Sequence, residues 1–138
     1  MTQESYVLRP VGWVRSSLVD RAQAPRQGDE GAPDAWLDFE PDLREALRDL
    51  EVGSDVLVLT WLHQADRDVL TVHPRGDVTR AEQGVFSTRS PHRPNPIGLH
   101  RVGILAIDGD RVHVSNLEAV DGTPILDVKP VLDPYTER

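Results

Sequence analysis

The hydrophobic and polar positions along the chain predict short β-strands separated by turns. Apolar residues either alternate with polar residues or form short runs, and Gly, Pro, Asn and Asp cluster between these segments. Alternation with a period of two is typical of a strand with one buried face, and a short apolar run is typical of a fully buried strand. The expected strands cover residues 6–14, 35–39, 55–62, 84–88, 99–107 and 111–117.

Turn and helix signals complete this picture. Asp108-Gly109-Asp110 separates the last two strands and predicts a hairpin, because the favoured two-residue turns need positive φ. Leucines at helical spacing, with a proline in the first turn, predict one short helix over residues 41–50. Six or more strands with a single helix indicate a mainly β fold, and a small closed barrel is favoured over an open sheet.

Two long polar segments interrupt the strands. Residues 15–34 contain prolines and glycines and predict a long loop, and residues 64–82 are charged and predict a surface excursion. Loops of this length in a compact domain are usually functional or disordered. We find no internal repeat or linker, so residues 1–138 are expected to form one domain.

Composition excludes several classes of protein. The chain has no cysteine, which rules out disulfides, thiolate metal sites and cysteine nucleophiles, and its five histidines show no metal-ligand spacing. There is no apolar run of about 20 residues, as a membrane span requires, and the polar residues 1–6 do not resemble a signal peptide. Dinucleotide-binding, P-loop, nucleophile-elbow and zinc-protease motifs are also missing. We expect a cytoplasmic protein with no metal and no membrane partner.

The charge distribution points to one positive region in an acidic protein. The net charge is −8, which argues against binding nucleic acid over the whole surface. Residues 83–107 nevertheless contain no Asp or Glu, although 23 acids in 138 residues would place about four in a segment of that length. The same segment holds three arginines and two histidines. We expect it to meet an anionic group, either a carboxylate, a phosphate or the chain's own acids.

The strongest candidate for a binding segment is residues 87–98, STRSPHRPNPIG. Its three prolines restrict φ and also restrict the residues that precede them. Such a loop loses little entropy on binding, and it would hold Arg89, Arg93 and Asn95 in set directions. We expect Arg93 and Asn95 to contact substrate. The alternative is a rigid strand connection with solvated arginines.

Three weaker candidates lie elsewhere in the chain. They are Ala24-Pro25-Arg26-Gln27-Gly28 in the long loop, Trp61-Leu62-His63-Gln64 at a strand end, and Asp121-Gly122-Thr123-Pro124. Each has a structural alternative, because D-G-T-P is a common turn and a histidine at a strand end is more often structural than catalytic.

Together the four segments resemble the TsaA-like, TrmO-type family of tRNA methyltransferases. The hallmark run of that family stands here as GVFSTRSPHRPNPIGL at residues 84–99, and a second run stands as DGTPILDVKP at residues 121–130. The P-R-Q element matches residues 25–27, and the similarity extends over most of residues 7–132.

The resemblance implies a small β-barrel that binds S-adenosylmethionine (SAM) with contributions from two subunits of a homodimer. It also implies methylation of the exocyclic N6 of threonylcarbamoyladenosine at position 37, next to the tRNA anticodon. Asp121 is the first candidate for the proton acceptor and His63 the second. The cofactor contacts carried over by motif are Pro25, Arg26, Gln27, His63, Gln64, Arg89, Leu99, Asp121, Gly122, Thr123 and Pro124.

Two features depart from the family pattern. Some members carry a carboxy-terminal domain, whereas this chain ends eight residues after Lys129-Pro130, so we expect a short form. The acidic net charge is also awkward for holding an anticodon stem-loop, unless a dimer joins two arginine-rich faces. A methyltransferase of the same fold acting on a small metabolite therefore stays open, as does a non-catalytic module that binds SAM or a nucleotide.

Overall fold

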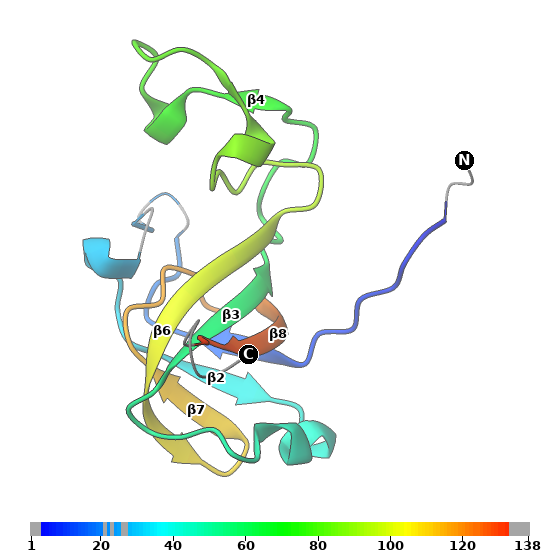
Figure 1. Ribbon diagram of the computed structural model, residues 1–138, viewed down its shortest axis with the longest axis vertical. Helices are drawn as coiled ribbons and strands as arrows, with labels where there is room; N and C mark the ends of the chain where they lie inside the picture. The colour runs from blue at the N-terminus through cyan, green and yellow to red at the C-terminus, as the bar shows by residue number, and fades with distance from the viewer. Residues whose placement is uncertain (1–3, 21, 23, 26–27, 133–138) are drawn as a thin grey trace.

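Six antiparallel strands form a closed barrel in the computed structural model, which describes residues 4–20, 22, 24–25 and 28–132. The strand order around the barrel is β1-β2-β7-β6-β3-β8 (Figure 1). Pairing of Gly12 with Ile125 and of Trp13 with Pro124 closes the ring. The predicted mainly β barrel is confirmed. The strands are β1 (Gly12–Arg15), β2 (Ala35–Phe39), β3 (Asp55–Trp61), β6 (Ile97–Asp108), β7 (Arg111–Val114) and β8 (Pro124–Pro130).

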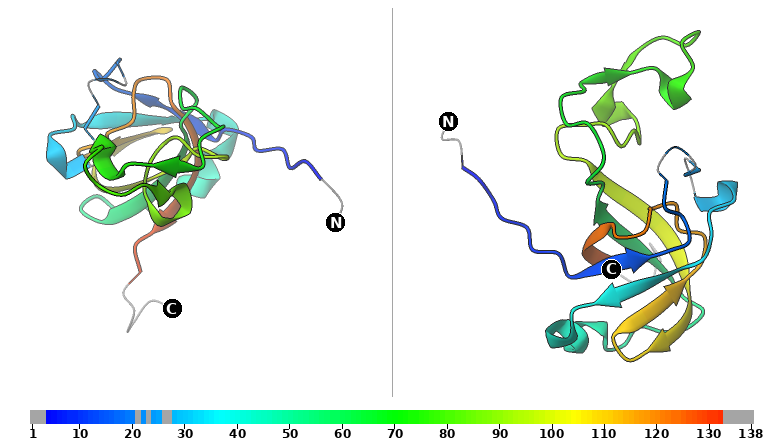
Figure 2. Two further views of the ribbon diagram at one scale, coloured as in Figure 1. Left: turned by 90° about the horizontal axis from the view of Figure 1, so that it is seen from above. Right: turned by 180° about the vertical axis from the view of Figure 1, so that it is seen from behind.

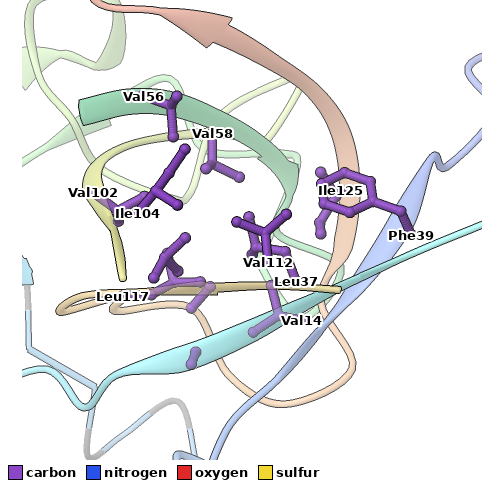
Figure 3. Close-up of a cluster of buried hydrophobic side chains, with 13 residues drawn as sticks. Val14, Leu37, Phe39, Val56, Val58, Val102, Ile104, Val112, Leu117 and Ile125 are labelled. Carbon is purple, nitrogen blue, oxygen red and sulfur yellow. The ribbon is translucent and has the colours of Figure 1, made fainter. Parts of the chain in front are cut away.

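Alternate residues of these strands fill the barrel. In β2, β3 and β7 every second side chain is buried, as the period of two predicts. The side chains converge from opposite walls, with Val58 and Ile104 facing Val14 and Leu37 (Figure 3). The residues after β7 also point inward, because Leu117 is fully buried in the same cluster.

The hairpin between β6 and β7 is confirmed. Gly109 has a φ of +62°, and Asp108 pairs with Arg111 across the turn. β7 ends at Val114 and not at the predicted residue 117, because Asn116 has a φ of +48° and turns the chain away. Leu117 then donates its backbone N–H to Pro33 O at 3.0 Å, in the long loop.

The structure corrects two further expected strands and adds β8, which was not expected. β1 covers only Gly12–Arg15, because residues 4–10 run away from the barrel with no partner strand (Figure 2). Residues 84–88 do not form a strand: β5 (Gln83–Gly84) ends there and a short 3₁₀ helix, η5 (Val85–Ser87), follows. β8, which closes the barrel, was not among the expected strands because its pattern is interrupted by the charged Asp127 and Lys129.

The predicted helix is also shorter and tighter than expected. It is a 3₁₀ helix, η3 (Pro41–Leu47), with i→i+3 bonds such as that from Leu43 N to Glu40 O at 3.0 Å. No side chain caps its amino end, and its residues are half-buried or exposed. Leu47 and Leu50, two of the regularly spaced leucines, pack against the core and cover one end of the barrel.

Residues 62–96 form an excursion inserted between two paired strands. Trp61 of β3 pairs directly with Ile97 of β6, so the chain leaves and rejoins the barrel at one point. The excursion contains β4 (Thr71–Val72), which pairs with β5, and the 3₁₀ helices η4 (Pro74–Gly76) and η5. It stands over the end of the barrel opposite η3 (Figure 1). Within the described residues, no helix has the length and apolar character needed to cross a membrane.

Candidate functional site

A large cleft lies where the excursion meets the open end of the barrel. Its volume is about 1110 Å³, and its walls come from four separate parts of the chain. These are the long loop after β1, the excursion, the first residues of β6 and the segment between β7 and β8. Six of the expected cofactor contacts line the cleft: Pro25, His63, Gln64, Arg89, Leu99 and Thr123. Segments that are far apart in sequence are thus brought together at one cleft.

Arg89 is the described cleft arginine most available to a ligand. It is exposed and lines both the cleft and a smaller neighbouring pocket of about 480 Å³. Within the described part of the chain its side chain makes no hydrogen bond or ion pair. An unpaired guanidinium at this position can bind a carboxylate or phosphate through two parallel hydrogen bonds.

Arg93 and Asn95, the expected substrate contacts, have partners within the protein. The guanidinium of Arg93 donates to Val85 O and, at 2.9 Å, to Thr88 O, which ties the middle of the proline-rich loop to its start and to η5. Arg93 still lines the cleft, whereas Asn95 does not. Asn95 Oδ1 accepts a hydrogen bond of 3.0 Å from Arg67, whose guanidinium also lies over the ring of Trp61. These contacts stiffen the loop beyond what its prolines impose.

The D-G-T-P segment joins the long loop to β8. Asp121 Oδ1 accepts a hydrogen bond of 3.0 Å from Ser16 N, and Gly122, at a φ of +82°, donates to Val14 O at 2.7 Å. Thr123 is buried and donates to Val120 O at 2.7 Å. Of the four residues only Thr123 lines the cleft, and Pro124 begins β8. Arg26 and Gln27, also expected to contact the cofactor, lie outside the described residues.

A buried polar chain at the base of the cleft was not expected from the sequence. His100 is 5% exposed; its Nε2 lies 2.7 Å from Thr60 Oγ1 and its Nδ1 lies 2.6 Å from Glu118 Oε1. A carboxylate can only accept, so Nδ1 carries a proton and donates it to Glu118. In the neutral imidazole, Nε2 then accepts from the hydroxyl of Thr60. A histidine on the inward-facing positions of β6, which otherwise carry glycine and aliphatic residues, is the signal that could have found it.

Glycine makes room for this chain of hydrogen bonds. A Cβ on Gly98 would lie 2.5 Å from Thr60 Oγ1 and 2.7 Å from His100 Nε2, closer than real Cβ atoms approach. Gly98 therefore allows the two polar side chains to meet beneath β6. The family-like run that contains Gly98 thus has a packing role.

The electrostatics of the cleft match the predicted positive region. The described residues that line it include three arginines, four histidines and one acid, Glu118. Arg75 forms an ion pair with Glu30, and His73 Nε2 lies 3.8 Å from Glu82. The acid-free residues 83–107 supply β5, η5, the proline-rich loop and the start of β6, which together form much of the wall.

Asp77 in the excursion has a lowered pKa, and the described residues form no cluster suited to a metal ion. Hydrogen bonds from the hydroxyl and the backbone N–H of Thr79 lower the pKa of Asp77 below its ordinary value of 3.8, with a smaller contribution from His73. In the part of the chain that is described, no group of three or more His, Asp or Glu side chains is arranged to hold a metal ion.

Comparison with known proteins supports the resemblance. The profile of the tRNA-methyltransferase O N-terminal domain matches residues 13–136. A "Probable S-adenosyl-L-methionine-binding protein" of Methanothermobacter thermautotrophicus is 46% identical over 89% of this chain and 88% of its own length. An "S-adenosyl-L-methionine-binding protein" of Archaeoglobus fulgidus is 40% identical over 89% of this chain and 87% of its own length.

Solved structures show the same architecture. TrmO from Pseudomonas aeruginosa superimposes with a TM-score of 0.75 and 32% identity, over 98% of this chain and 61% of that one. A second TrmO structure gives a TM-score of 0.76 and 35% identity, over 97% of this chain and 60% of that one. The chain thus spans about three fifths of the solved proteins that it matches. With residues of both family-like runs lining one cleft, the chain belongs to the tRNA-methyltransferase O N-terminal domain family.

Proposed function

We propose that this protein is a SAM-dependent methyltransferase that modifies the exocyclic N6 of threonylcarbamoyladenosine at position 37 of tRNA. The observation that carries the proposal is the cleft, in which four remote segments meet around Arg89, which has no partner among the described residues. The family and the names of the relatives support SAM as the methyl donor.

The residues around the cleft suit SAM. Arg89 can hold the carboxylate of its methionine part through two hydrogen bonds. The exposed apolar side chains of Leu99, Ile97 and Phe86 line the same cleft and can cover its less polar parts. We retain Pro25, His63, Gln64 and Thr123 as proposed contacts, and Asp121, Gly122 and Pro124 as neighbours that shape the turn. The cleft is as large as sites for drug-sized ligands, which run to about 1,000 Å³.

The proposed reaction requires the protein mainly to position the two reacting molecules. SAM supplies a methyl group that its sulfonium already activates. The residues of the cleft therefore need to align the acceptor nitrogen in line, exclude water and accept a proton. Holding the reacting groups in place removes an entropic barrier of about 7–11 kcal/mol in favourable cases. No metal enters this proposal.

We further propose a homodimer that presents two positive clefts to the anticodon stem-loop. The outer side of β6 leaves Ile97, Leu99, Leu105 and Ile107 between 38% and 44% exposed, and exposed apolar patches often mark interfaces. Pairing of two arginine-bearing faces would offset the net charge of −8 when tRNA binds. A tRNA substrate would place the enzyme in the cytoplasm.

The acidic net charge is unfavourable for holding a polyanion such as tRNA, so it favours one alternative function, methylation of a small metabolite in the same cleft. Purified protein and SAM, incubated with tRNA from a strain lacking the gene or with a metabolite extract, should form S-adenosylhomocysteine (SAH) only with tRNA. Mass spectrometry of the tRNA nucleosides should show the added methyl group on threonylcarbamoyladenosine. Turnover with the extract alone would favour the metabolite, and SAM binding without any turnover would favour a non-catalytic module. Excess chelator should change neither binding nor turnover.

A further inference from the structure

Glu118 differs in charge from the arginines and histidines that line the cleft. It is the one acid among the described residues that line the cleft, and it also borders the smaller pocket beside Arg89. Its side chain is 16% exposed, so it is largely shielded while one edge stays accessible.

The two oxygens of Glu118 have different surroundings. Oε1 accepts the hydrogen bond of 2.6 Å from His100 Nδ1, and His100 is held in turn by Thr60. Oε2 has no hydrogen-bond partner among the described residues. Since no fully buried side-chain oxygen or nitrogen in that part of the chain lacks a partner, Oε2 is not fully buried. One oxygen therefore orients the carboxylate and the other can act on a ligand.

The long loop passes close to Oε2 on one side. A Cβ on Gly28 would lie 3.1 Å from this atom, a tight contact that the glycine avoids. The same Cβ would lie 2.2 Å from Asn116 O, so only glycine allows the long loop to pass this close to the segment between β7 and β8. Glu118 thus lies where the long loop, β6 and the proline-rich loop approach one another.

We propose that Glu118 is the catalytic proton acceptor of the methyl transfer and that His100, bonded to Thr60, is its positioning residue. This inference rests on the proposed function. The lone pair of the acceptor nitrogen forms the new nitrogen–carbon bond while the carbon–sulfur bond breaks and its electron pair stays on sulfur. The proton on the acceptor nitrogen passes to Glu118 Oε2, and the donated hydrogen bond from His100 keeps Oε1 in place.

The geometry favours Glu118 over the two acceptors expected from the sequence. Asp121 does not line the cleft, and its Oδ1 already binds the backbone of Ser16. His63 lines the cleft but is exposed to solvent just after β3, and no hydrogen bond to a described residue orients its ring. Glu118 is both shielded and oriented, as a general base should be.

A charged ligand can test the position of Glu118 without turnover. Sinefungin carries a protonated amine in place of the methylsulfonium group, whereas SAH is neutral there. If Oε2 faces the transferring methyl, Glu118→Gln should weaken sinefungin at least tenfold in calorimetric titration and change SAH affinity less than threefold. Glutamine keeps an oxygen for His100, so the fold should persist. Asp29→Asn, which removes an exposed acid bordering only the smaller pocket, is the control and should leave both affinities unchanged.

Single-turnover methyl transfer provides the second measurement. General-base catalysis contributes about 10²–10⁴-fold, so Glu118→Gln should slow transfer by at least 100-fold with SAM bound. His100→Phe should lower the rate and the preference for sinefungin together, because the carboxylate loses its orientation. If Glu118→Gln melts below the assay temperature, Glu118→Asp replaces it and should slow transfer at least tenfold while still binding SAH.

The outcomes separate this inference from the proposed function. If the wild type transfers methyl groups and a Glu118 variant transfers them equally fast, Glu118 is not the proton acceptor. The proposed methyltransferase activity is unaffected by that result. Equal losses of sinefungin and SAH would likewise overturn the role of Glu118, because they indicate a general binding defect. A wild type that binds SAM but transfers nothing to any acceptor overturns the methyltransferase, and the proton acceptor with it.

Discussion

Arginines near the cleft differ in what they already bind. Arg67, Arg75 and Arg93 each have partners inside the protein, and Arg89 has none among the described residues. The first three therefore set the shape of the excursion and the proline-rich loop, and Arg89 is available to a ligand. The proline pattern predicts the rigidity of this loop, but the internal partners of Arg93 and Asn95 follow only from its folded path.

Replacing Arg89 should affect binding and not stability. Loss of a hydrogen bond to a charged group costs about 1.5–3 kcal/mol, so Arg89→Ala should weaken SAM by roughly 10- to 150-fold. Arg89→Lys should recover part of this, because an ammonium lacks the planar fork. Calorimetry and a thermal melt of the same sample provide the measurements, with the exposed Arg48→Ala at the far end of the barrel as control. Unchanged affinity in a well-folded Arg89→Ala protein would show that Arg89 does not contact SAM.

Thr79 should control the titration of Asp77 in the excursion. Its hydroxyl donates to Asp77 Oδ1 at 2.6 Å and its backbone N–H donates at 2.9 Å, and both hydrogen bonds stabilise the ionised carboxylate. Thr79→Val removes only the first bond, so the pKa of Asp77 should rise toward 3.8. Because the folded pKa is lowered, this stabilisation is present above pH 3.8 and is lost as the pH falls through the folded pKa. An NMR titration checks the shift, and an unmoved pKa would contradict the assignment.

Among the elements, β6 links the core to the site. Its inward positions change along its length from Gly98 and His100 beneath the cleft to Val102 and Ile104 in the hydrophobic core. The period of two predicts which residues face inward. Two of these inward positions, Gly98 and His100, support a polar network. The network also needs Thr60 in β3 and Glu118, which lie 40 and 18 residues from His100 in the sequence.

A side chain at Gly12 should destabilise the barrel at its closure. A Cβ there would lie 2.6 Å from Asp38 O and 3.0 Å from Phe39 Cα, and backbone atoms of β2 cannot move aside cheaply. Overpacking of this kind costs about 1–3 kcal/mol, so Gly12→Ala should lower Tm by at least about 3 °C. Gly84→Ala is the matched control, because its Cβ would meet nothing within 4 Å and its φ is −60°. Equal Tm values for the two variants would refute the close contact between β1 and β2.

At the scale of the whole molecule, the dimer proposal makes a direct prediction. Sedimentation at micromolar concentration should show a species of twice 15.4 kDa. Leu105→Glu with Ile107→Glu, which places charges on the outer side of β6 away from the cleft, should shift the protein toward monomer. A wild type that sediments only at 15.4 kDa would contradict the proposal.

The local sequence determined the elements of this protein, and the tertiary structure determined what they do together. Period-two patterning, the Asp-Gly turn and the proline-rich loop depend on neighbouring residues, so strands such as Ala35–Phe39 could be read directly. The 3₁₀ geometry of η3, the closure by β8 and the partners of Arg93 depend on packing between remote segments. The Thr60–His100–Glu118 chain has the same origin, because burial of its polar groups is favourable only where all three meet.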